Sequence, residues 1–216
     1  MYDPVAFRID DKAALVALIR AFPLGLLVAP RDGDRLFASA DLIPFIVDDG
    51  GRVLRAHVAA ANPLCATLAE PREVLVVFQG PQAYVSPAHY PSKRRHGRVV
   101  PTWNYTMIQV EGMARRRDET EWKVAQVAAL TVQQEKNRAE PWAITDAPDD
   151  FVAGQLRAIV GVEIEISVLK GKYKLSQNRD DADRNGAIAG LAAEGSPGSG
   201  AVAQFMAARK ERGSRG

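Results

Sequence analysis

Two tight turns constrain this fold most, because each stands between apolar stretches that are too short to be helices. Residues 24–29 predict a short buried strand, and the turn Arg31-Asp32-Gly33-Asp34 leads into a second strand from Leu36 to about Val47. A second turn, Asp48-Asp49-Gly50-Gly51, leads into a strand over residues 53–58. Glycine accepts the positive φ that such hairpin turns require. This part of the chain therefore predicts antiparallel hairpins, with Pro44 at a bulge or a sheet edge.

Helices are predicted where a capping residue precedes apolar residues at helical spacing. Asp10 or Asp11 caps a first helix that ends near Phe22, and Asn62 with Pro63 forms the start of a second, short helix. The further predicted elements are strands at 74–78 and 83–86, a long loop at 87–101, a strand at 104–117, a helix from a capping box of Asp118 and Glu121 to about Arg138, a helix at 151–159, a strand at 162–168 and a short helix at 201–209.

Short strands joined by tight turns, with helices inserted and appended, predict an α+β fold. We expect a small barrel or an antiparallel sheet with peripheral helices. Regular strand–helix alternation is missing, which argues against a doubly wound parallel fold. Residues 195–200 are rich in Gly and Ser and predict a flexible linker. The expected organisation is one domain over residues 1–194, followed by a linker and a short C-terminal helix over residues 195–216.

The composition is that of an ordinary globular chain. The 216 residues are 47% hydrophobic and 25% charged, which excludes disordered, collagen-like and coiled-coil classes. No apolar run approaches the roughly 18–20 residues that span a bilayer, so no membrane partner is expected. The N-terminus lacks the layout of a signal peptide, and the single cysteine, Cys65, cannot form an internal disulfide. Both features predict a cytoplasmic location.

Charge alone does not identify a partner. The formal net charge is +2, too small by itself to indicate nucleic-acid binding. Basic side chains nevertheless cluster at residues 93–98, 115–117 and 209–215. Such clusters are typical of solvated loops or chain ends, with contact to nucleic acid as the alternative.

The familiar catalytic and metal-binding motifs do not occur. Ser86 and Ser92 lack a G-x-S-x-G context, and the three histidines and Cys65 lack the spacing of zinc ligands. Neither a P-loop nor a G-x-G-x-x-G sequence is present, which argues against those two nucleotide sites. No catalytic residue is predicted, and whether the chain is an enzyme stays open.

Four polar and aromatic clusters remain, at residues 54–63, 78–87, 100–105 and 172–179. In the first, Arg55 and His57 precede the helix start at Asn62, where cationic side chains and free N–H groups suit a phosphate. The alternative is an ordinary cap with surface side chains. Trp103 and Asn104 offer a flat ring a stacking surface and hydrogen bonds, or they are core anchors. The last cluster is either part of such a site or a solvated strand end.

Three of these stretches carry a resemblance to a known family. They read VFQGPQAYVSP at 77–87, VPTWNY at 100–105 and YKLSQNR at 173–179, in this order. Together with the opening Met1-Tyr2-Asp3-Pro4, they resemble the PaiB family of FMN-binding negative transcriptional regulators. The resemblance extends from Met1 to about Leu191.

The resemblance implies an FMN-binding split β-barrel that forms a homodimer, with the flavin at the subunit interface. The site residues that it implies are Asp41, Arg55, His57, Asn62, Tyr84, Ser86, Trp103, Asn104, Tyr105, Lys174 and Gln177. Those up to Asn62 would hold the ribityl phosphate and one edge of the ring, and the others would line the site, some from the second subunit. Where the family tends to read Ala-Thr-His-Leu-Pro, this chain has Ala40-Asp41-Leu42-Ile43-Pro44, so an acidic side chain replaces a neutral one.

By the same resemblance, the expected function is transcriptional repression. No helix–turn–helix pattern is evident, so DNA would be contacted through the basic clusters or indirectly. The alternative is a flavin-dependent oxidoreductase of the type related to pyridoxamine-phosphate oxidase, and a third hypothesis is a binding protein without flavin.

Overall fold

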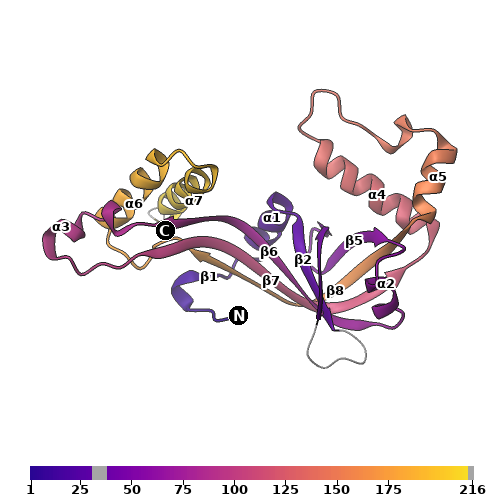
Figure 1. Ribbon diagram of the computed structural model, residues 1–216, viewed down its shortest axis with the longest axis horizontal. Helices are drawn as coiled ribbons and strands as arrows, with labels where there is room; N and C mark the ends of the chain where they lie inside the picture. Colours follow the sequence, from indigo (N-terminus) through magenta and orange to yellow (C-terminus); the bar gives the residue numbers. More distant parts are fainter. Residues whose placement is uncertain (31–37, 214–216) are drawn as a thin grey trace. The chain divides into compact units, whose positions relative to one another are not determined.

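A computed structural model describes residues 1–30 and 38–213 of the chain (Figure 1). The predicted turn at residues 31–34, the start of the strand predicted from Leu36 and the basic residue Arg215 lie outside these residues. The described strands are β1 (Arg8–Ile9), β2 (Leu24–Pro30), β3 (Ala38–Pro44), β4 (Ile46–Val47), β5 (Val53–Ala59), β6 (Arg72–Val85), β7 (Thr102–Arg117) and β8 (Ile159–Lys174). The described helices are α1 (Lys12–Ala21), α2 (Leu64–Thr67), α3 (Ser92–His96), α4 (Thr120–Glu135), α5 (Asp149–Arg157), α6 (Asp181–Ala193) and α7 (Pro197–Gly213), with 3-10 turns η1 (Val5–Phe7), η2 (Pro87–His89) and η3 (Ile144–Asp146).

The strands hydrogen-bond in the order β3-β2-β6-β7-β8-β5-β4, and β1 pairs with β8. Every pair whose register is described is antiparallel. The predicted α+β class, an antiparallel sheet with peripheral helices, is therefore confirmed. Within the described residues the hydrogen-bonded order begins at β3 and ends at β4, so it forms an open sheet and not a closed ring of strands.

The chain folds into two compact units, and each of the three long strands β6, β7 and β8 contributes a part to both. The sheet unit comprises Asp11–Phe78 and Ile108–Leu169. The tail unit comprises Met1–Asp10, Gln79–Met107 and Lys170–Gly216.

The sheet unit forms around the hairpins that the sequence predicts. Asp11 accepts a hydrogen bond from the Ala13 N–H at 2.9 Å, which confirms the cap of α1. The turn before β5 is also confirmed, because Asp48 Oδ1 accepts from the Val53 N–H at 2.7 Å and Gly51 has a φ of +58°. Gly25 lets β2 approach the core closely, since a Cβ there would lie 2.8 Å from a ring carbon of Phe78.

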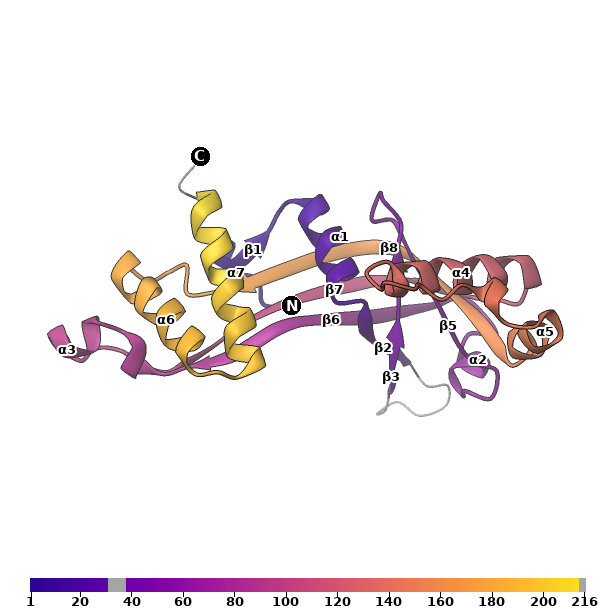
Figure 2. The same ribbon diagram turned by 90° about the horizontal axis from the view of Figure 1, so that it is seen from above.

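In the tail unit, α6 and α7 lie side by side, and α6 packs against η2 (Figures 1 and 2). A buried contact joins α3 to α6, because Ser92 Oγ donates to Asp183 Oδ2 at 2.6 Å. His89 packs so closely on α6 that a Cβ at Gly190 would lie 2.1 Å from its Nδ1. His89 Nε2 also lies 2.9 Å from Glu194 Oε1 at the end of α6.

Several predicted boundaries differ from those in the structure. The expected loop at 87–101 contains η2 and α3, and the strands expected at 74–78 and 83–86 are one continuous strand, β6. The capping box of Asp118 does not form, because that carboxylate accepts from Arg116 at 2.6 Å and α4 begins one residue later than such a cap requires. The expected linker is helical from Pro197 onward, and α6 was not predicted.

Among the helices that the structure describes, none has both the length and the apolar character needed to cross a bilayer.

Candidate functional site

The predicted site residues divide between the two units. Asp41, Arg55, His57 and Asn62 belong to the sheet unit. The other predicted site residues belong to the tail unit and are Tyr84, Ser86, Trp103, Asn104, Tyr105, Lys174 and Gln177.

In the sheet unit, Arg55 and His57 project from the same face of β5. Their cross-strand neighbours on β8 are Glu163 and Gly161, respectively. Arg55 Nε lies 3.5 Å from Glu163 Oε2, so its charge is already compensated by a carboxylate. The Arg55 side chain is half-exposed, and its contact with a phosphate stays a prediction.

Glu163 is the centre of a hydrogen-bonded cluster that the sequence analysis missed. Arg117 on β7 donates to Glu163 Oε1 from Nη2 at 2.5 Å and from Nε at 3.2 Å, and Trp122 on α4 donates to Oε2 at 3.2 Å. Burial alone would raise the pKa of Glu163, but the hydrogen bonds from Arg117 and Trp122, with the charges of Arg117 and Arg55, hold that pKa below its ordinary value. The only sequence signals were the basic run at 115–117 and an acidic residue on an alternating strand.

His57 lies next to this cluster in an apolar environment. Trp122 covers Gly161 so closely that a Cβ there would lie 2.2 Å from the Trp122 ring. Burial lowers the pKa of His57, which favours the neutral imidazole. The Nδ1 atom of His57 is buried and has no hydrogen-bond partner among the described residues.

Asn62 performs the structural part of its predicted role. Its Oδ1 accepts from the N–H of Leu64, the first residue of α2, at 2.8 Å, so the side chain satisfies a free N–H at the helix start as expected. The helix begins one residue later than predicted, with Pro63 at the N-cap position. Its Nδ2 donates to Asp41 Oδ1 at 3.0 Å. The acidic side chain of Asp41 is thus held by a neutral amide from the predicted phosphate segment.

In the tail unit, the structure brings together Tyr84, Trp103, Tyr105 and Lys174. The rings of Tyr84 and Trp103 meet edge to face, with centroids 6.1 Å apart, and are 45% and 54% exposed. Lys174 Nζ donates to the Trp103 carbonyl at 2.6 Å and to Thr102 Oγ1 at 2.5 Å, and it lies 5.8 Å from the centre of the Tyr105 ring. Burial, together with the charge of Lys172, lowers the pKa of Lys174. An exposed aromatic wall therefore stands beside a cation.

Asn104 lies behind this wall, inside the unit. It is fully buried, and its Nδ2 donates to Ser176 Oγ at 3.0 Å and contacts Met206 Sδ of α7 at 3.4 Å. Ser176 has a φ of +61°, a conformation that few residues other than glycine adopt. The Asn104 amide therefore holds the strained turn after β8 and docks α7.

Ser86 and Gln177 make local contacts. Ser86 Oγ accepts from the Ala88 N–H at 3.2 Å and so caps η2. Gln177 Oε1 accepts from the Leu175 N–H at 2.6 Å, and its Nε2 donates to the Tyr173 carbonyl at 2.5 Å. Contact of these two residues with a cofactor stays a prediction.

The residues present fit a flavin in their chemistry. Exposed aromatic side chains suit stacking against a flat ring, and Lys174 suits the negative charge of a phosphate or of a reduced ring. Buried polar atoms without partners commonly mark places where a ligand or water completes the hydrogen bonding. Ser39 Oγ, on β3 next to the segment that holds Asp41, is such an atom in the described part of the sheet unit.

Comparison with known proteins supports the same cofactor. A family model described as "Putative FMN-binding domain" matches residues 1–168. An uncharacterized protein of Emericella nidulans is 34% identical over 91% of this chain and 92% of its own length. The Bacillus subtilis protein named Protease synthase and sporulation protein PAI 2 is 28% identical over 95% of this chain and 96% of its own length. These matches confirm the resemblance seen in the motifs and the prediction of FMN as the cofactor.

Solved structures share the fold at low sequence identity. The FAD and heme binding protein from Mycobacterium smegmatis matches with a TM-score of 0.59 and 21% identity, covering 85% of this chain and 80% of that one. The flavocytochrome Anf3 from Azotobacter vinelandii matches with a TM-score of 0.56 and 14% identity, covering 82% and 74%.

The lowered pKa of His57 predicts a pH dependence of stability. The unfolded state takes up a proton near the ordinary pKa of about 6.5, whereas the folded state does so only at lower pH. Stability is therefore fully present at pH 7 and above and is lost as the pH falls through about 6.5 toward the folded pKa. Urea unfolding of the parent and of His57→Gln, compared between about pH 7.5 and about pH 5, should show a steeper loss in the parent. A difference in unfolding free energy between the two proteins that does not change with pH would contradict this.

Proposed function

Because the chain belongs to the FMN-binding domain family, we propose that it binds FMN as a homodimeric split barrel and acts as a negative transcriptional regulator in the cytoplasm. The observation that carries the flavin site is the exposed pair Tyr84–Trp103 beside Lys174. FMN, when bound, supplies a ring that accepts and returns electrons. Trp103 and Tyr84 would contact the ring, and Lys174 would hold negative charge on the ring or on the phosphate.

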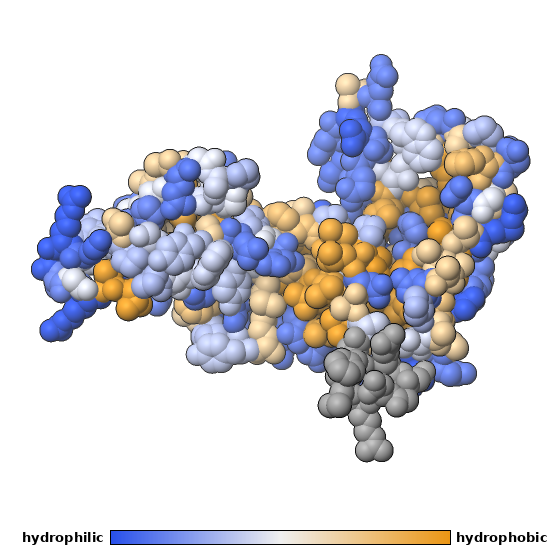
Figure 3. Space-filling model, in the orientation of Figure 1, coloured by the Kyte–Doolittle hydropathy of each residue, from blue (hydrophilic) through white to orange (hydrophobic). Residues whose placement is uncertain are grey.

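Assembly into a dimer is supported by an apolar strip on the outer face of β2, β3 and β6. Leu26 stands opposite Leu42 on β3 and opposite Val77 on β6, so the three share one face of the sheet. Leu24, Leu26 and Leu42 are 53%, 36% and 67% exposed. Figure 3 shows hydrophobic side chains gathered over this part of the sheet unit. A contiguous exposed apolar face is typical of a subunit interface, and a second copy presents the same face for a two-fold contact.

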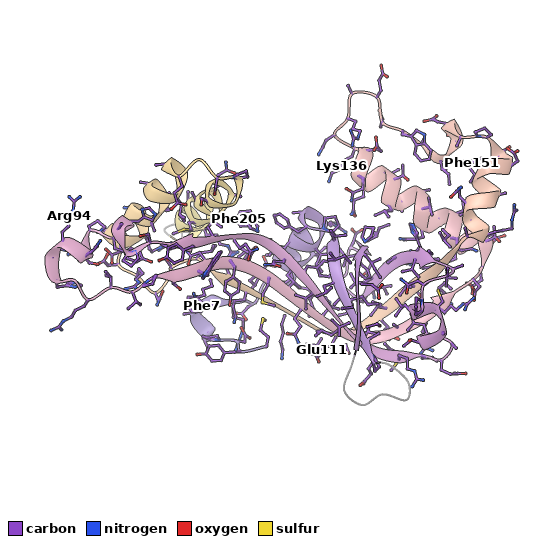
Figure 4. The ribbon with its side chains drawn as sticks, viewed as in Figure 1. Phe7, Arg94, Glu111, Lys136, Phe151 and Phe205 are labelled. Atoms are coloured by element: carbon purple, nitrogen blue, oxygen red, sulfur yellow. The ribbon has the colours of Figure 1, made fainter. Side chains whose placement is uncertain are left out.

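DNA contact is supported by the basic surface of α3 in the tail unit. Arg94 on α3 (Figure 4) and its neighbour Lys93 are exposed. Arg95 pairs with Asp180 at 3.2 Å. A dimer would carry this surface twice, which raises the number of phosphate contacts. The cytoplasmic location is supported by Cys65, a free and buried thiol.

Flavin-dependent oxidoreduction is the second candidate, favoured by the exposure of Trp103 and Tyr84. If the flavin ring rests on the exposed side chains of Trp103 and Tyr84, its other face stays open to a second substrate. A regulator does not need such an open face. Anaerobic addition of NADPH separates the candidates: rapid bleaching of the flavin absorbance supports the enzyme, and a stable oxidised spectrum supports the regulator.

The flavin site predicts a specific effect of removing one charge. Lys174→Gln should weaken FMN binding about tenfold or more, because a charge-assisted contact is lost. Lys170→Gln, an exposed lysine on the same strand, is the matched control and should bind FMN like the parent. The measurement is a titration of FMN by fluorescence quenching. Equal affinities for both variants and the parent would remove Lys174 from the site.

The apolar strip predicts the oligomeric state. The parent should sediment with twice the chain mass of 23.5 kDa, and Leu42→Glu should sediment near 23.5 kDa because a charge cannot be buried in that interface. Val132→Glu introduces the same charge at a residue of α4 that is 68% exposed, and it should remain dimeric. A parent that sediments as a monomer at micromolar concentration overturns the proposed dimer.

A further inference from the structure

A second pocket lies in the sheet unit, between β5 and the α4–α5 segment. It encloses about 190 Å³. Its walls include Val127 of α4, Trp142 from the connection between the helices, and Phe151 and Gln155 of α5, and His57 of β5 also lines it. Figure 4 shows Phe151 near the beginning of α5. Of these residues, only His57 belongs to the predicted flavin set.

The walls are held in place from two sides. Lys123 of α4, itself almost fully buried, donates to the carbonyls of Leu156 at 2.7 Å and Ile159 at 3.3 Å, which fixes the end of α5 against α4. On the other side, the Trp142 N–H donates to Glu135 Oε2 at 3.3 Å, and Asp146 Oδ2 accepts from the Ala143 N–H at 2.8 Å. Contacts within the chain therefore fix the walls of the pocket, as is usual for small-molecule sites.

The size of the pocket suits a ligand of one or two rings. An engineered protein cavity of about 150 Å³ accommodates benzene. A pocket of about 190 Å³ is slightly larger. FMN has three fused rings and a ribityl phosphate chain and does not fit this volume.

The lining selects a neutral, flat molecule. The pocket is lined by apolar side chains apart from His57 and Gln155, and none of its lining residues is acidic, Lys or Arg. Trp142 and Phe151 are 46% and 57% exposed, so they form a rim against which a flat ring can stack. The imidazole of His57, which lines the pocket, offers a hydrogen bond to a ligand N–H or O–H group.

We propose that this pocket binds a small neutral heteroaromatic molecule of one or two rings that carries one hydrogen-bonding group, at a site separate from the flavin. This goes beyond the proposed function, because it does not depend on FMN being bound.

The test uses indole as the probe, measured by isothermal titration calorimetry with and without FMN. Indole should bind with a Kd of about 1 mM or below. Indene has the same shape without the N–H, and it should bind about two- to tenfold more weakly. Ala147→Leu fills the pocket and should weaken indole binding tenfold or more. Ala153→Leu, the same replacement at an exposed position of α5, is the control and should bind like the parent.

A second measurement keeps the proposal testable if Ala147→Leu does not fold. In a heteronuclear NMR spectrum of the parent, the ring N–H signal of Trp142, assigned with Trp142→Phe, should move on adding indole while that of Trp103 stays in place. Any one of three results overturns the proposal. They are no indole binding up to about 10 mM, unchanged indole affinity in a folded Ala147→Leu, and a signal shift at Trp103 in place of Trp142. Competition between indole and FMN also overturns it, because the pocket would then be part of the flavin site. Failure of FMN to bind while indole binds at Trp142 refutes the proposed function and leaves this inference intact.

Discussion

The sheet unit depends on one partly buried carboxylate, Glu163, which joins three strands and a helix. It accepts hydrogen bonds from Arg117 of β7 and Trp122 of α4, and it pairs with Arg55 of β5. A carboxylate removed from water is costly unless it is paired and hydrogen-bonded, so these partners stabilise each other's positions. Trp122 then covers Gly161 beside His57, which places α4 over β5. The histidine, which also lines the α5 pocket, lies next to this cluster.

In the tail unit, the buried amide of Asn104 is the contact that holds separate segments together. Asn104 ties the turn at Ser176 to Met206 of α7, directly behind the exposed Trp103. An aromatic side chain on a rigid support presents its face at a lower entropic cost than one on a mobile loop. Asn104 was predicted to contact the cofactor, and the structure shows its amide engaged inside the unit. Its contribution to flavin binding would therefore be indirect, through the position of its neighbour.

The parts of the fold that the sequence predicted correctly rest on local chemistry. The cap at Asp11, the Asx contact at Asn62 and the turn at Asp48–Gly51 each involve residues within a few positions of one another. The parts of the fold that the sequence did not predict depend on contacts between residues that are distant in the chain. Helix α6 was not predicted because its apolar pattern is weak. In the structure, Gly186 and Gly190 let this helix pack closely on His89, about 100 residues away in sequence. The pairing of Arg55 with Glu163 requires the register of β5 on β8, which spacing alone does not provide.

A double-mutant cycle on Arg117 and Glu163 tests the central role of this cluster most directly. The free energy of unfolding would be measured by urea for the parent, Arg117→Gln, Glu163→Gln and the double variant. If the carboxylate organises the sheet unit, the two single losses should sum to more than the loss in the double variant, with a coupling of about 1 kcal/mol or more. Single losses that add to the double loss within about 0.3 kcal/mol would show that the two side chains act independently and would contradict the account.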